Sequence, residues 1–167
     1  MPEIIKVFND KAPAMRFIGK KYTDYSHWGE WFANSWFDTV EQAMGGTQSI
    51  LAVWENGGGY CGLECHGEDG AFDYWIGMFT PADTPVPEGF DFVDFPAGGI
   101  GTCWIYGPED EVHGKIPSCY DALMRAGLEP KRDGCGRLWS FENGLCPRFT
   151  TPDEQGNVIL DYCYYLN

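Results

Sequence analysis

The chain has 167 residues, of which 44% are hydrophobic and 16% aromatic, so it can bury the core of one medium-sized domain and is not a disordered segment. Its 11 basic and 25 acidic side chains give a formal net charge of −14. A field of this sign repels nucleic-acid phosphates and anionic lipid heads. We therefore expect no direct nucleic-acid binding and no membrane binding. The charge favours a cationic ligand or a basic protein partner, although an acidic surface also serves solubility alone.

The cysteines, the first residues and the lengths of the apolar runs bear on cellular location and on metal binding. Seven cysteines are an odd number at scattered positions, which is typical of reduced thiols in a cytoplasm rather than of a disulfide framework. The first residues lack the pattern of a signal peptide, and no apolar run approaches the ~20 residues that span a bilayer. We expect a cytoplasmic protein. Cys61, Cys65 and His66 have metal-like spacing but no second paired cluster, so we expect neither a metal nor a cofactor.

Apolar, β-branched and aromatic runs between turn signals predict most of the strands. They are expected at residues 4–7, 14–22, 49–55, 60–65, 72–79, 90–95, 100–106, 137–142 and 159–166. Aromatic and apolar residues recur at helical spacing from Trp28 to Met44, after a capping residue at Ser26, which predicts a helix packed against a sheet. A second helix is expected between Pro117 and Gly127.

Three short motifs occur in the same order on either side of a proline-containing stretch at residues 80–89. They are Pro-Ala at 13 and 96, Glu-Asn-Gly at 55 and 142, and Asp-Tyr at 73 and 161. We predict one α+β domain over residues 1–167, built from two pseudo-twofold-related strand–helix–strand–strand repeats with a central ligand cleft between them. The repeats are expected at about 13–79 and 90–167, joined by the linker 80–89. Glu55 and Glu142 are expected at equivalent strand positions.

Glu142 is the acid that the sequence singles out. It follows Trp139 and Phe141 on a predicted strand that ends at Asn143-Gly144, so it lies among aromatic side chains. In such surroundings it either reaches water at a strand end or is held where its charge is used. The three histidines show no partnering pattern in the sequence.

Several short motifs then resemble one family. They are Pro87-Glu88-Gly89-Phe90, residues 96–100 through Gly107-Pro108, Ile116-Pro117 with Tyr120 and Ala122-Leu123, Phe141-Glu142, Asp161-Tyr162 and, in the first half, Phe17-Ile18-Gly19. In this order they resemble the GyrI-like effector-binding family, which includes the gyrase-inhibitory protein and the ligand-binding domains of AraC-type and MerR-type multidrug regulators. The resemblance covers roughly residues 12–167. It departs at Gly144, where the family often has Tyr, and at Tyr165-Leu166, where the family often has a Pro-containing dipeptide, and these departures bear on pocket shape and ligand identity.

The resemblance implies the site residues. The acid that matches Glu142 is expected to project into the central cleft, where it meets lipophilic cations in drug-binding members and assists ring opening in a hydrolytic subgroup. Trp104, Tyr106 and Tyr164 lie on strands that resemble the cleft strands of the family, and Tyr74 matches Tyr162 by the repeat. We expect Trp104, Tyr106, Tyr74 and Tyr164 to line the cleft beside Glu142, although strand alternation does not say which face meets the helices.

Three functions follow from these expectations. The first is a stand-alone binding protein for a small, lipophilic, cationic and aromatic effector, with no helix-turn-helix segment of its own. The second is a hydrolase of electrophilic or cyclopropanoid toxins that uses Glu142 with a nearby tyrosine. The third is an acidic protein-interaction module of the gyrase-inhibitor type, with a protein partner. The sequence contains no Ser-His-Asp set, P-loop or dinucleotide fingerprint, so other enzyme classes have little support.

Overall fold

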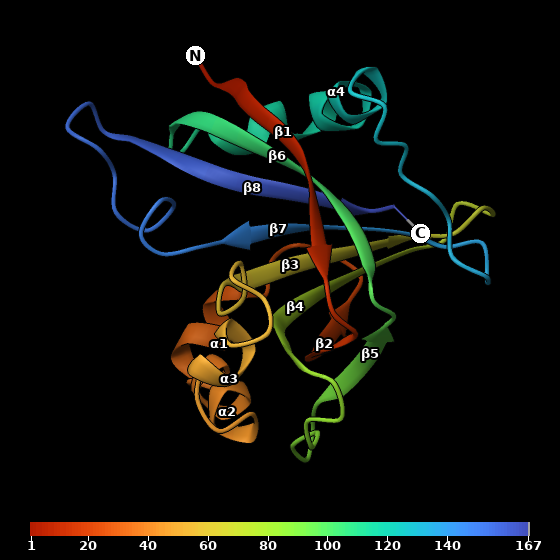
Figure 1. Ribbon diagram of the computed structural model, residues 1–167. Helices are drawn as coiled ribbons and strands as arrows, with labels where there is room; N and C mark the ends of the chain where they lie inside the picture. The colour runs from red at the N-terminus through yellow and green to blue at the C-terminus, as the bar shows by residue number, and fades with distance from the viewer. Residues whose placement is uncertain (167) are drawn as a thin grey trace.

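The computed structural model describes residues 1–166, and its eight strands form one antiparallel sheet (Figure 1). The strands are β1 (Glu3–Ala12), β2 (Met15–Tyr22), β3 (Tyr60–His66), β4 (Phe72–Pro81), β5 (Asp91–Phe95), β6 (Gly98–Pro108), β7 (Leu138–Gly144) and β8 (Asn157–Tyr165). The helices are α1 (Trp28–Ala33), α2 (Trp36–Ala43), α3 (Gln48–Leu51), the 3₁₀ helix η1 (Val112–Ser118) and α4 (Cys119–Arg125). The architecture agrees with the expected α+β class. No helix within residues 1–166 is long and apolar enough to cross a bilayer.

The strand order, β1-β6-β8-β7-β3-β4-β2-β5, places β3 and β7 side by side at the centre of the sheet. On one side of this pair lie β4 and β2, and on the other side lie β8 and β6. The outer strands cross over, because β1 pairs with β6 and β5 pairs with β2. The two parts of the chain therefore meet edge to edge within one sheet, through the pairing of β3 with β7.

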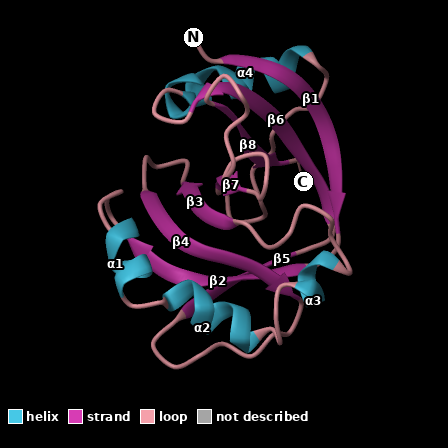
Figure 2. Ribbon diagram, turned by 90° about the vertical axis from the view of Figure 1, so that its left-hand side faces the viewer, coloured by secondary structure: helices cyan, strands magenta, loops and turns pink. Residues whose placement is uncertain are grey.

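The sheet curls strongly (Figure 2). An aromatic core packs within the curl. Phe95 on the edge strand β5 stacks on Tyr165 of β8, with ring centroids 4.4 Å apart, although four strands separate them in the sheet. Phe95 also packs edge-on against Trp139 of β7 at 5.1 Å, and Phe79 of β4 contacts Phe141 of β7 at 4.8 Å. These contacts bury the apolar face of the strands and leave the opposite face of the central strands to the helices.

Two expected elements differ from the structure. The long aromatic helix is broken into α1 and α2 at Ser35, whose φ of 53° is left-handed and cannot continue a right-handed helix. The segment 49–55 is not a strand but α3 and a turn, because Ile50 and Trp54, four residues apart, are the members that pack into the core. Glu55 lies exposed in that turn, so the prediction that it occupies a strand position equivalent to Glu142 is wrong.

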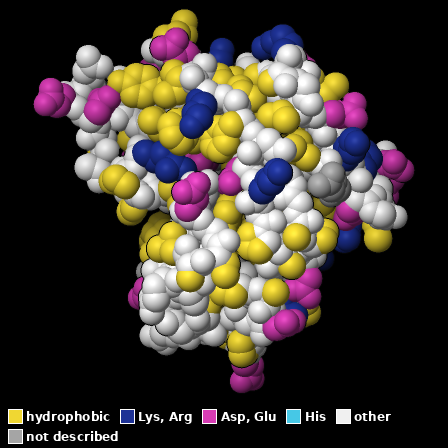
Figure 3. Space-filling view, viewed as in Figure 1, with side chains coloured by type: hydrophobic (Ala, Val, Ile, Leu, Met, Phe, Trp, Pro, Cys, Tyr) yellow, Lys and Arg dark blue, Asp and Glu magenta, His cyan; other side chains and the backbone are white. Residues whose placement is uncertain are grey.

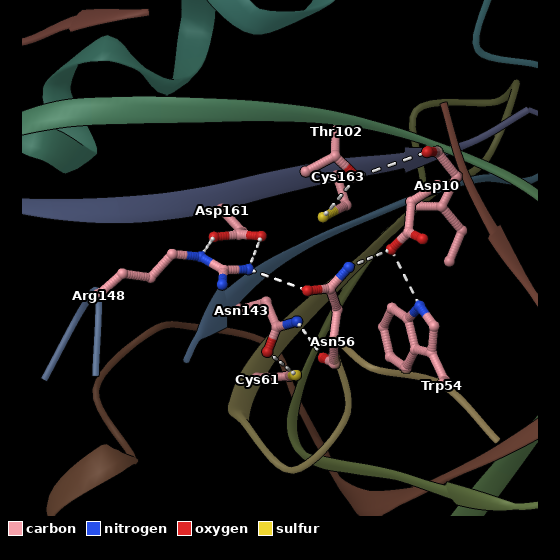
Figure 4. A network of polar contacts seen from close by, with 10 residues as sticks. Asp10, Trp54, Asn56, Cys61, Thr102, Asn143, Arg148, Asp161 and Cys163 are labelled. Carbon is pink, nitrogen blue, oxygen red and sulfur yellow. Dashed lines mark hydrogen bonds and ion pairs between the residues drawn. The ribbon is translucent and has the colours of Figure 1, made fainter. Parts of the chain in front are cut away.

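A buried polar network ties the edge strand β1 to β8 and to the loops beside them (Figure 4). Arg148, after β7, binds Asp161 of β8 through two hydrogen bonds of 2.7 Å each. Its Nη2 also donates to Asn56 at 3.1 Å, and the Asn56 amide donates to Asp10 of β1 at 2.7 Å. Trp54 donates its indole N–H to the same Asp10 carboxylate at 2.9 Å. Burial raises the pKa of Asp161, and Arg148 opposes that shift, so Arg148 favours the ionised form of the Asp161 carboxylate.

The net charge of −14 is not gathered into one patch on the face seen in Figure 3. There, acidic and basic side chains are dispersed among hydrophobic ones.

We expect Arg148→Met to lower the free energy of unfolding by about 3 kcal/mol, because it leaves the Asp161 carboxylate, whose side chain is 2% exposed, without its counter-charge. Denaturant unfolding at pH 7 measures the change. The matched control is Arg137→Met, whose pair with Asp133 is more exposed, at 45% and 25% for the two side chains, and whose loss costs at most about 1 kcal/mol. Equal losses in the two variants would contradict a buried ion pair at Asp161.

Candidate functional site

A cavity of about 860 Å³ lies between α1 on one side and η1 and α4 on the other, over the central strands. Its lining combines six tyrosine and tryptophan rings with two glutamates, two histidines and one arginine. The residues are Tyr25, Trp28, Glu64, His66, Tyr74, His113, Ile116, Pro117, Tyr120, Arg132, Leu138, Ser140, Glu142, Tyr162 and Tyr164. A second cavity of about 460 Å³ adjoins it, with a lining that adds Phe32, Tyr60 and Phe149. Trp28, His113 and Glu142 line both cavities, so these three residues mark the boundary between them.

Glu142 reaches the cavity because of what lies opposite it on β3. In the antiparallel β3–β7 pair its partner is Gly62. A Cβ atom on Gly62 would come within 2.2 Å of the Tyr74 hydroxyl and 2.6 Å of the Glu142 Oε1 atom. The missing side chain therefore makes the space in which the carboxylate meets Tyr74. The Glu142 side chain is 18% exposed and thus largely desolvated.

Both carboxylate oxygens of Glu142 accept hydrogen bonds from the protein. The Tyr74 hydroxyl donates to Oε1 at 3.1 Å, and this hydroxyl itself accepts the indole N–H of Trp28 at 2.8 Å. His113 Nε2 lies 2.9 Å from Oε2. Burial and the Glu142 carboxylate raise the pKa of Tyr74, so its hydroxyl stays protonated and acts as a donor. The hydrogen bond to Glu142 raises the pKa of His113 above its ordinary value of 6.5.

A second acid, Glu64 of β3, lies on the same face of the sheet as Glu142 and lines the same cavity. Its Oε1 is 3.1 Å from His66 Nε2, and its Oε2 is 3.5 Å from the Tyr162 hydroxyl. Tyr162 also shares a hydrogen bond of 2.9 Å with Ser140, the residue opposite Glu64 on β7. Each central strand thus contributes one glutamate. Glu64 of β3 contacts the Tyr162 hydroxyl of β8, and Glu142 of β7 contacts the Tyr74 hydroxyl of β4.

The remaining rings extend the aromatic lining. Tyr25 packs edge-on against Tyr74 at 4.6 Å, and Tyr164 contacts Tyr120 of α4 at 5.6 Å and Tyr162 at 5.5 Å. Arg132 at the rim donates to the backbone carbonyl of His66 at 3.0 Å. Such a lining presents ring faces and hydroxyl edges around two carboxylates, which suits an aromatic molecule carrying positive charge.

The structure brings together three of the five residues expected at the site. Glu142, Tyr74 and Tyr164 line the larger cavity, and their role as ligand contacts stays a prediction. Trp104 and Tyr106 do not reach it. Trp104 pairs with Asp161, on the opposite face of the sheet from Tyr162, and its ring lies beside Lys6 and Arg148. Tyr106, two residues on and on the same face, bonds to Asp153. The expectation that these two rings lie near Glu142 is therefore corrected.

Sequence reasoning missed Trp28, Glu64, His113 and Tyr162 as cavity residues. Alternation from Tyr164 could have identified Tyr162, because residues two apart on a strand share a face. His113 had no signal, since it comes to Glu142 from η1, 29 positions earlier in the chain. All three histidines pair with carboxylates, although the sequence shows no partnering pattern for them. Within residues 1–166 no group of three or more His, Cys, Asp or Glu side chains is arranged to hold a metal ion.

No protein-family model matches the sequence, and no curated protein matches it. Solved structures do match over nearly the full chain. One is a proposed bacterial transcription regulation protein from Staphylococcus aureus MU50, with a TM-score of 0.58 and 13% identity over 97% of this chain and 98% of that chain. SAV2435 bound to tetraphenylphosphonium has a TM-score of 0.58 and 12% identity over 98% and 94% of the two chains. A hydrolase from Listeria innocua has a TM-score of 0.51 and 11% identity over 97% and 92%.

These similarities establish a shared fold. They are consistent with the GyrI-like effector-binding fold that the sequence motifs indicated.

We expect an NMR titration of the three histidines to give His113 a pKa above 6.5, and Glu142→Gln to lower it. Because the folded pKa is raised, the His113–Glu142 pair stabilises the fold fully below the unfolded pKa near ~6.5. That stability is lost as pH rises through the folded pKa. His27, whose partners are Asp24 and Glu30, is the control whose pKa should not respond to Glu142→Gln. An unchanged His113 pKa in the variant would contradict the ion pair.

Proposed function

We propose that this chain is a small-molecule-binding protein for lipophilic aromatic cations, and that Glu142 supplies the counter-charge in an aromatic cavity. The observation that carries this proposal is the position of Glu142, largely desolvated at the junction of two cavities whose walls are rich in aromatic rings. The same proposal places the protein in the cytoplasm, which fits seven free thiols within residues 1–166.

Physical chemistry favours a cation at this position. A largely desolvated carboxylate attracts a positive charge more strongly than a solvated one because fewer waters compete. Each ring face that contacts the cation adds about 0.5–2 kcal/mol. A neutral ligand gains from the rings but not from the charge, and a ligand anion is repelled. Glu142 therefore selects by charge, while the rings accept many shapes.

The similarity to SAV2435, which binds tetraphenylphosphonium, supports a ligand of the same class here. We also infer that the chain is an internal duplication and that the larger cavity is the cleft between its halves. The strand order is symmetric about β3 and β7, and Glu64 and Glu142 occupy the fifth position of these two strands. In this alignment Glu64, and not Glu55, is the counterpart of Glu142.

We expect Glu142→Gln to weaken tetraphenylphosphonium binding by about 2–4 kcal/mol, roughly 30- to 800-fold, because it keeps the side-chain shape and removes the charge. Isothermal titration calorimetry or fluorescence quenching measures the change. Triphenylphosphine oxide, a neutral aromatic phosphorus compound, should lose far less affinity. Equal losses for the two ligands would mean that Glu142 acts through shape, and the cation-binding proposal would fail.

A hydrolase is the second candidate, and the hydrogen bond between Tyr74 and Glu142 favours it. A carboxylate can take a proton from an attacking water and return it to a leaving oxygen or nitrogen, while the hydrogen bond from a tyrosine hydroxyl holds the carboxylate in place. The similarity to a Listeria innocua hydrolase adds fold-level support.

An enzyme of this kind predicts a different response to Glu142→Gln. Turnover of an electrophilic, strained-ring substrate should fall by a factor of about 100 or more, while substrate binding survives. Tyr74→Phe should act in the same direction, and Tyr25→Phe, at a largely exposed ring without a bond to Glu142, serves as its control. Turnover that is unchanged in both Glu142→Gln and Tyr74→Phe would exclude this chemistry.

A further inference from the structure

The site carries its own cation. His113 lies 2.9 Å from Glu142, on the oxygen that Tyr74 does not use, and its ring packs edge-on against Phe149 at 6.2 Å. The His113 side chain is 51% exposed, so it can leave Glu142 without opening the core. It belongs to the short 3₁₀ helix η1, and the two cavities have His113 in common.

We propose that His113 is the residue that determines access to Glu142: it occupies the carboxylate when no ligand is bound, and a lipophilic cation binds by taking its place. This inference rests on the proposed function and names a residue that decides its specificity. Because His113 borders both cavities, its departure joins them at Glu142. The ligand class is then a cation with aromatic groups on more than one side of the charge, which fill the two cavities at once.

The competition follows from charge. When His113 is protonated, a ligand cation must break an ion pair and release the imidazolium to water. When His113 is neutral, the ligand displaces a hydrogen bond to the carboxylate but breaks no ion pair, so the attraction between two full charges is not lost. Bringing a second cation to Glu142 also lowers the pKa of His113, so the ligand expels a proton. Affinity therefore rises as pH increases through the pKa of His113, which Glu142 raises above 6.5.

Other titratable and charged groups face His113 or share its cavities, and each is accounted for. They are Glu142 on β7, Glu109 before η1, Lys115 on η1, Glu64, His66 and Tyr60 on β3, Tyr74 on β4, Tyr162 and Tyr164 on β8, Tyr120 on α4, and Tyr25 and Arg132 in loops. Between pH 5.5 and 8.5 carboxylates are ordinarily ionised, and tyrosine, lysine and arginine keep their protons. Histidines are the groups that change charge in this range, and His66 is the one that competes with His113 as an explanation.

The test is a titration of tetraphenylphosphonium by calorimetry from pH 5.5 to 8.5, in buffers of different ionisation enthalpy, so that affinity and proton release are measured together. For the wild-type protein we expect affinity to rise by up to tenfold per pH unit below the pKa of His113 and then level off, with up to one proton released on binding at the low end. His113→Gln should bind more tightly than wild type at pH 5.5, release no proton and lose the pH dependence. His113→Lys carries its charge throughout and should bind at least tenfold more weakly than wild type at pH 8.5.

The other two histidines provide matched controls. His66→Gln changes the histidine paired with Glu64 in the same cavity, and His27→Gln changes one paired with Asp24 and Glu30 outside it. Both variants should keep the slope and the proton release of the wild-type protein. Thermal unfolding of each variant establishes that it is folded before it is titrated.

The outcomes separate the two proposals. Binding that depends on Glu142 but is independent of pH, or a pH dependence that survives His113→Gln, overturns the role of His113 and leaves the cation site standing. A pH dependence that is lost in His66→Gln assigns the titration to His66, and this result also overturns the role of His113. If tetraphenylphosphonium binds none of the proteins at any pH, the proposed function and this inference both fail.

Discussion

The antiparallel pairing of β3 with β7 is the constraint on which the rest of the site depends. It sets Gly62 opposite Glu142 and Ser140 opposite Glu64, so that both acids emerge on one face beside a small partner. Side chains alternate between the faces of a strand, and a slip of one residue would exchange the two faces. Such a slip would bury Glu142 in the core that Phe141 fills and would turn Phe141 toward solvent. The apolar core therefore holds the register that positions the charges.

Alternation also explains which part of the site could be read from the sequence. Glu142 and Tyr164 could be proposed as neighbours because they lie on strands that resemble cleft strands of the GyrI-like family, and Tyr74 because the repeat matches it to Tyr162. The pattern does not reveal which face of β6 carries the helices. Trp104 lies on the face away from the cavity, where its cross-strand partner is the buried Asp161. His113 could not be found at all, since its approach to Glu142 depends on how η1 packs on the sheet. Tertiary contacts of this kind have no periodicity in the chain.

The sequence predicts the fold more fully than the site. Eight of the nine expected strands correspond to strands of the structure, because their β-rich runs are bounded by turn residues. The strand prediction for residues 49–55 was wrong for a physical reason. The apolar residues of this segment fit both strand and helix spacing, and the burial of Ile50 and Trp54 selects a helical turn. The break at Ser35 likewise has no sequence mark as strong as glycine or proline, because a serine rarely adopts a left-handed conformation. The edge-to-edge joining of the two halves depends on strand pairing across more than 70 residues, which local patterns do not encode.

The contacts of Glu142 also bear on how a cavity can hold a charge without a ligand. A largely buried carboxylate is costly unless its oxygens are hydrogen-bonded, and here Tyr74 and His113 each satisfy one of them. These donors lower the gain that any ligand obtains, because part of the attraction is already used. The loss falls unequally on different ligands. A cation replaces the charge of His113 with its own, whereas a neutral molecule that displaces His113 leaves one oxygen of a largely buried carboxylate unsatisfied. If Glu142 binds a ligand as proposed, its internal partners weaken binding in general and sharpen the selectivity for positive charge.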